Sequence, residues 1–176
     1  DSISEEQRVT SGAHLSQGRE PDRSKVNLTA HRSILGVVMS PDGKTIAVCD
    51  RESQIAIYDV KKGEQLAITK NPQSSTSTTV CRFRADGRML FTSDSQGIKA
   101  WNVARDGKLS EEFQYNGHVP SLAGAVTALV VSDNGKIAAS LGRDGTLKIW
   151  SATDGREVAS YSTGLSAHFV VCCWIS

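Results

Sequence analysis

Short apolar runs, separated by turn residues, fill most of the chain from residue 26 onward. The stretch "SPDGKTIAVCDRESQIAIYD" at 40–59 begins with a tight-turn signal, continues through an apolar run, and turns again before a second run. Related stretches begin at Arg84 and Ser132. Apolar runs of this length, bounded by turn signals, predict short β-strands joined in hairpins.

These stretches recur at a nearly constant spacing. Intervals of 44 and 48 residues separate three turn pairs, Asp42-Gly43, Asp86-Gly87 and Asn134-Gly135. Intervals of 43 and 49 residues separate three strand-ending aromatic residues, Tyr58, Trp101 and Trp150. Two independent landmarks therefore report one period in the low-to-middle forties, which is typical of repeat architectures.

Each repeat predicts four antiparallel strands, within 32–70, 78–116 and 125–163. The run "AVTALVVS" is apolar at both alternating sets of positions, which indicates a strand buried on both faces. Asn134-Gly135 predicts a two-residue turn with positive φ at both residues. A flanking strand is expected at each end, "KVNLTAH" before the first repeat and 168–176 after the third; the alternative for 168–176 is an unrelated terminal sequence. We expect an all-β chain without a long helix.

Composition narrows the class of protein further. The 176 residues carry a net charge of +1, so they have no general attraction to nucleic acid or to an anionic membrane. No apolar run approaches the roughly 20 residues that span a bilayer. Residues 1–24 are polar, with few large apolar groups, and predict a disordered N-terminal tail ahead of a repeat domain at 25–176.

No motif for catalysis, a metal or a cofactor is found, so we expect none of these. The cysteines Cys49, Cys81, Cys172 and Cys173 lack zinc-ligand spacing, and they predict reduced, mostly buried thiols rather than a disulfide framework. A Gly-x-Ser-x-Gly elbow and a phosphate-binding Gly-x-x-x-x-Gly-Lys loop are both missing from the sequence.

Several segments resemble the WD-repeat family of β-propellers. "NGHV" at 116–119 resembles its Gly-His start, "SPDG" at 40–43 its inner hairpin turn, and "RDGTLKIWS" at 143–151 its Asp-to-Trp segment. The resemblance covers about residues 26–176. It departs from the family at Trp101-Asn102 and Trp150-Ser151, where the aspartate is missing, and ahead of the second repeat, which lacks the histidine. These losses weaken the Asp-His-Ser-Trp network that the family uses inside each blade.

The resemblance implies a partial WD-repeat propeller with three complete blades. It gives His31, His118 and His168 structural positions ahead of first strands. It also implies that Trp101 and Trp150 pack between blades, in preference to forming an aromatic cage for a methylated lysine.

The resemblance also implies a non-enzymatic scaffold that binds other proteins in the cytoplasm or nucleus. The alternative is a propeller that promotes catalysis, such as an exchange factor for a small GTPase. Turns between second and third strands, with the loop ahead of the third repeat, are the expected partner surface: Arg51, Glu52, Ser95, Gln96, Arg143, Asp144, Val119 and Pro120.

The number of blades in a closed propeller affects the expected stability and association of this chain alone. Family members usually have about seven blades, which need about 300 residues at this period. We expect either a fragment or isoform of a longer propeller, or a second chain that completes the ring. The isolated chain is expected to aggregate, to dimerise through its uncovered edges, or to need the rest of a longer product.

Overall fold

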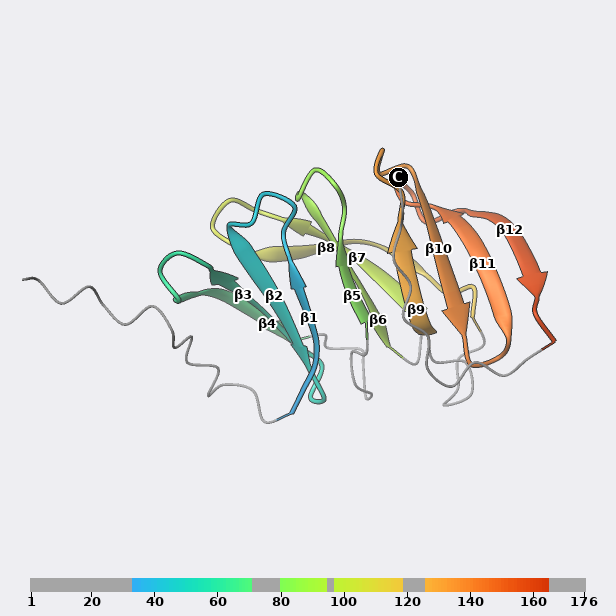
Figure 1. Cartoon of the computed structure of the whole chain (residues 1–176), viewed down its shortest axis with the longest axis horizontal. Coiled ribbons are helices and arrows are strands. Elements are labelled where there is room, and N and C mark those ends of the chain that lie inside the picture. The colour runs from blue at the N-terminus through green and yellow to red at the C-terminus, as the bar shows by residue number, and fades with distance from the viewer. Residues whose placement is uncertain (1–32, 71–79, 95–96, 119–125, 165–176) are drawn as a thin grey trace, which may run out of the picture.

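A computed structural model of the chain describes residues 33–70, 80–94, 97–118 and 126–164. These residues form three four-stranded antiparallel sheets that lie side by side (Figure 1). The strands of each sheet are hydrogen-bonded in sequence order, and the described residues contain no helix. The prediction of three complete blades is confirmed. The predicted tail and both flanking strands fall outside the described residues.

We call the three sheets blades 1, 2 and 3. Blade 1 contains β1 (Ile34–Met39), β2 (Thr45–Asp50), β3 (Gln54–Asp59) and β4 (Gln65–Lys70). Blade 2 contains β5 (Val80–Phe83), β6 (Met89–Asp94), β7 (Gly97–Val103) and β8 (Leu109–Tyr115). Blade 3 contains β9 (Val126–Val131), β10 (Ile137–Gly142), β11 (Thr146–Ser151) and β12 (Glu157–Ser162).

Equivalent turns join the first and second strands of the three blades, as predicted. In blade 3 the Gly135 N–H donates to the Ser132 carbonyl at 2.8 Å, and the Asn134 side chain accepts the Lys136 N–H at 3.0 Å. The same bonds occur around Gly43 and Gly87. The expected two-residue turn is wrong, however. Ser132 N–H bonds the Ile137 carbonyl, which makes the connection longer, and Gly135 has positive φ whereas Asn134 does not.

These first-hairpin turns follow one edge of the three blades. A Cβ on Gly87 of blade 2 would lie 3.7 Å from Cδ of Pro41 in blade 1. A Cβ on Gly135 of blade 3 would lie 2.8 Å from Cγ of Arg84 in blade 2. Because neighbouring strands run antiparallel, the turns between second and third strands of blades 1 and 3 lie along the opposite edge, at the bottom of Figure 1.

Two hydrophobic cores lie between the blades rather than inside them. A sheet of four strands has two faces, and each apolar face must be covered by another element. The core between blades 1 and 2 contains Ala47, Cys49, Ile55, Ile57, Cys81, Phe83, Leu90 and Trp101. The core between blades 2 and 3 contains Met89, Phe91, Ile98, Ala100, Tyr115, Val126, Leu129, Ala138, Trp150 and Ala152. The strand-ending tryptophans therefore pack between blades, as the resemblance implied.

The exposure of side chains on the far face of blade 3, which no described blade covers, can be compared with that of equivalent side chains on the covered faces of blades 1 and 2. Ile55 of blade 1 and Ile98 of blade 2 occupy the position of Leu147 in blade 3. Ile55 and Ile98 are fully buried by the next blade, whereas Leu147 is only half-buried. On the last strand, Tyr115 is 5% exposed, but the equivalent Tyr161 is 55% exposed. The far face of blade 3 is thus apolar and open.

Candidate interaction edge and its polar supports

The turns between second and third strands of blades 1 and 3 form an edge that carries Arg51, Glu52, Arg143 and Asp144; we call it the second-hairpin edge. In blade 1 it is shaped by Asp50, whose side chain is buried. Its Oδ1 accepts the N–H of Glu52 at 2.9 Å and of Gln54 at 2.8 Å. Because Asp50 satisfies these backbone donors, the exposed side chains of Arg51 and Glu52 are held on a fixed turn.

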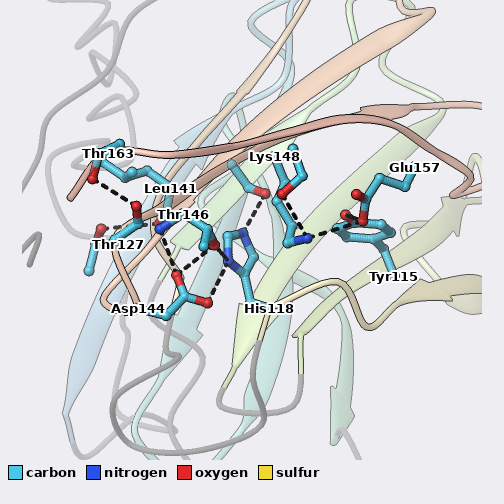
Figure 2. A network of polar contacts seen from close by, with 12 residues as sticks. Tyr115, His118, Thr127, Leu141, Asp144, Thr146, Lys148, Glu157 and Thr163 are labelled. Atoms are coloured by element: carbon cyan, nitrogen blue, oxygen red, sulfur yellow. Dashed lines mark hydrogen bonds and ion pairs between the residues drawn. The ribbon is translucent and has the colours of Figure 1, made fainter. Parts of the chain in front are cut away.

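In blade 3 the turn is tied to the preceding segment through His118 (Figure 2). Its Nε2 lies 2.8 Å from Oγ of Ser140, and its Nδ1 lies 3.1 Å from Oγ1 of Thr146 and 3.4 Å from Oδ2 of Asp144. Oδ1 of Asp144 accepts the Thr146 hydroxyl at 2.7 Å. Asp144 therefore directs its carboxylate inward, and the neighbouring Arg143 is exposed.

Burial decides the charge of His118, which is 2% exposed. Removal from water lowers the pKa of His118 below its ordinary value, although the Asp144 carboxylate opposes this shift. The imidazole is accordingly neutral at physiological pH, with one nitrogen donating and the other accepting. This arrangement makes His118 a cross-link between three segments of blade 3.

The predicted surface residues divide into three groups. Arg51, Glu52 and Arg143 are exposed on the second-hairpin edge. Asp144 lies on the same edge, but its carboxylate binds within the blade. Four others fall outside the described residues: Ser95, Gln96, Val119 and Pro120. Of the three predicted structural histidines, His118 alone lies within the described residues.

A second polar group joins blade 2 to blade 3 (Figure 2). The Tyr115 hydroxyl donates to Oε2 of Glu157 at 2.9 Å, and Nζ of Lys148 approaches the same oxygen at 3.2 Å. The Tyr115 ring stacks on Trp150 with 5.4 Å between ring centroids. Burial and the nearby Glu157 carboxylate raise the pKa of Tyr115, so its hydroxyl remains a donor.

Blade 2 contains the equivalent lysine and glutamate. Lys99, 1% exposed, reaches Oε2 of Glu111 at 3.0 Å and lies 5.9 Å from the centroid of the Trp101 ring. Sequence reasoning missed both ion pairs. The signal was nevertheless present, since each lysine lies two residues before a strand-ending tryptophan, in "KAW" and "KIW".

The two strand-ending tryptophans differ in their hydrogen bonding. Trp101 donates from Nε1 to Oγ1 of Thr92 at 2.8 Å. Trp150 Nε1 is buried without an acceptor, whereas Ser140, the register equivalent of Thr92, is bonded to His118. The Asp-His-Ser-Trp network is therefore divided between blades, with the Trp contact retained in blade 2 and the His contacts in blade 3.

Two other features were searched for in the described residues. No cluster of three or more His, Cys, Asp or Glu side chains there is arranged to hold a metal ion. None of those residues forms a helix long and apolar enough to cross a membrane.

Known proteins resemble this chain in both sequence and fold. The model of the WD domain, G-beta repeat matches residues 23–59 and 109–151. The solved structure of U3-55K superposes with a TM-score of 0.64 at 23% identity, covering 73% of this chain and 39% of that one. Together with the blade topology and the turn chemistry, these findings support a WD-repeat protein with the fold of a partial propeller.

Two curated relatives share one name, p21-activated protein kinase-interacting protein 1-like. The Gallus gallus protein is 29% identical over 142 residues, which are 80% of this chain and 36% of that protein. The Xenopus laevis protein is 25% identical over 165 residues, which are 93% of this chain and 43% of that protein. The chain thus spans about two-fifths of the length of these relatives.

Proposed function

We propose that this chain is a non-enzymatic scaffold that binds other proteins through the second-hairpin edge. Proteins of this family generally serve as protein-interaction modules, and the name shared by the two relatives describes an interaction with another protein. The observation that carries the proposal is that, on this edge, two acidic side chains bind within the turns while the basic side chains next to them are exposed. Asp50 and Asp144 bind within their turns, while the neighbouring Arg51 and Arg143 are exposed.

Such a division suits recognition of a protein surface. The two carboxylates fix the backbone of each turn, so binding loses little backbone conformational entropy, and the remaining cost is the ordering of the arginine side chains. Arginine can form two parallel hydrogen bonds to a carboxylate, which makes an acidic partner surface the best chemical match. Charge at the edge of an interface mainly affects the association rate and its salt dependence.

The experiment is a pull-down with the tagged chain, comparing two double charge reversals. Arg51→Glu with Arg143→Glu alters the second-hairpin edge. Lys44→Glu with Lys136→Glu makes the same change of charge at exposed lysines on the opposite edge and is the matched control. We expect the first variant to lose proteins that the wild type and the control both recover. Equal recovery by both variants refutes the surface, and stimulated nucleotide release from a small GTPase points to the exchange-factor alternative.

A further blade-like sheet is proposed to cover the far face of blade 3. Tyr115 on blade 2 stacks on Trp150 of blade 3 and donates to Glu157. Tyr161 has the equivalent position on blade 3 and is 55% exposed. The covering sheet is therefore expected to carry an aromatic residue near the end of its third strand and an acceptor at the start of its fourth. Nitration of Tyr161 in the purified chain, but not in a longer product or complex that supplies the covering sheet, supports this cover; equal nitration contradicts it.

A further inference from the structure

Two thiols occupy the core between blades 1 and 2. Cys49 lies on β2 and is 0% exposed, and Cys81 lies on β5 and is 2% exposed. Both belong to the same hydrophobic core, together with Ile55 and Trp101. They come from different blades, so a bond between them would link the two sheets covalently.

The strand register brings the two thiols together. Strand β1 pairs with β2 and lies beside β5, and the residue opposite Cys49 on β1 is Gly36. Strand β2 also contacts β5 directly, and both thiols belong to one hydrophobic core. The nearby Cys49 thiol, helped by the charge of Arg82, lowers the pKa of Cys81; the nearby Cys81 thiol and burial raise the pKa of Cys49.

The next interface shows that the repeat does not require a thiol pair there. By strand register, Ser93 of blade 2 is equivalent to Cys49, and Leu129 of blade 3 is equivalent to Cys81. Both Ser93 and Leu129 are buried, at 1% exposure each. The same position in the same fold is thus filled by a hydroxyl and an aliphatic group, so packing alone does not explain two cysteines.

We propose that Cys49 and Cys81 form a disulfide between blades 1 and 2 on reaction with a peroxide. The Cys81 thiolate attacks one oxygen of hydrogen peroxide, forming a sulfenic acid and releasing hydroxide. The Cys49 thiol then attacks the Cys81 sulfur, and its proton leaves with the sulfenic hydroxyl as water; the proton that Cys81 released on ionisation neutralises the hydroxide. Two thiols lose two electrons in total, and one peroxide becomes two waters.

Two physical points make the reaction feasible at a buried site. A peroxide is small enough to enter during local opening of the interface, which needs no global unfolding. Cys81 is the attacking group because the thiolate, not the thiol, is the nucleophile. The product closes the chain between β2 and β5, which restricts the unfolded ensemble and fastens blade 1 to blade 2.

The experiment uses the full chain with Cys172→Ser and Cys173→Ser, so that Cys49 and Cys81 are its only thiols. The native protein is treated with hydrogen peroxide, denatured, alkylated and analysed by mass spectrometry. We expect a product that lacks two hydrogen atoms, resists alkylation and yields a linked Cys49–Cys81 peptide. Reduction with dithiothreitol should restore both thiols. The linked form should melt about 5 to 10 °C higher than the reduced form.

Matched variants separate the linkage from unrelated oxidation. Cys49→Ser and Cys81→Leu reproduce the residues of the next interface and are expected to retain the fold. With Cys49→Ser we expect sulfinic or sulfonic acid on Cys81, because its resolving partner has been removed; with Cys81→Leu we expect Cys49 to remain a free thiol. The proposal is overturned if peroxide leaves both wild-type thiols alkylatable, or oxidises either one without linking them.

Discussion

The two strand-ending tryptophans allow a direct measurement of one buried hydrogen bond inside a repeat. Trp101 donates to Thr92, while Trp150 has no acceptor although the equivalent Ser140 is present. Two double-mutant cycles compare them: Trp101→Phe with Thr92→Val, and Trp150→Phe with Ser140→Ala. Each cycle isolates the pairwise coupling, because the losses of ring packing and of the Ser140–His118 bond cancel.

The two coupling free energies are expected to differ by the contribution of one buried hydrogen bond. A buried neutral hydrogen bond contributes about 0.5–1.5 kcal/mol net, so the blade 2 cycle should give a coupling of about 1 kcal/mol. The blade 3 cycle should give a coupling within about 0.3 kcal/mol of zero, because Trp150 and Ser140 share no hydrogen bond. Trp150→Phe also removes an unsatisfied buried donor, which offsets part of its packing loss.

Equilibrium unfolding in urea at a fixed protein concentration measures both couplings. A fixed concentration is needed because self-association shifts apparent stability by mass action. With a slope of about 1–3 kcal/mol per molar urea, a coupling of 1 kcal/mol corresponds to a midpoint difference of about 0.3–1 M. A coupling in blade 3 as large as that in blade 2 would refute the reasoning.

Three further predictions follow from the same contacts. Gly97→Ala should destabilise the fold by more than about 2 kcal/mol, because its Cβ would overlap the Tyr115 carbonyl and its φ is positive. Gly43→Ala, at positive φ but with open space around it, should cost only about 1 kcal/mol, and urea midpoints check both. Because the folded pKa of His118 lies below 6.5, stability should be complete above pH 6.5 and decline as the pH falls below it; His118→Gln should flatten this dependence in thermal melts. The isolated chain should sediment as a dimer or aggregate through its open apolar faces; a monomer with a cooperative melt contradicts this.

The fold of this chain was predictable because its signals are local. A hairpin turn such as Ser132–Ile137 is specified by an Asn side chain that accepts a backbone N–H and by a glycine at positive φ, all within a few residues. Alternation of apolar residues then specifies which faces of each strand are buried. The detail that failed, positive φ at Asn134, depended on loop length, which turn residues alone do not fix.

The arrangement between blades was decided only by the tertiary structure. The contact of Cys49 with Cys81, the bond from Tyr115 to Glu157, and the inward carboxylate of Asp144 each join segments that are distant along the chain. Equivalent positions of the repeat also differ in burial, as Tyr115 and Tyr161 do. Sequence encodes the two faces of every sheet, but stacking determines which face meets a neighbour, and therefore which side chains become partners.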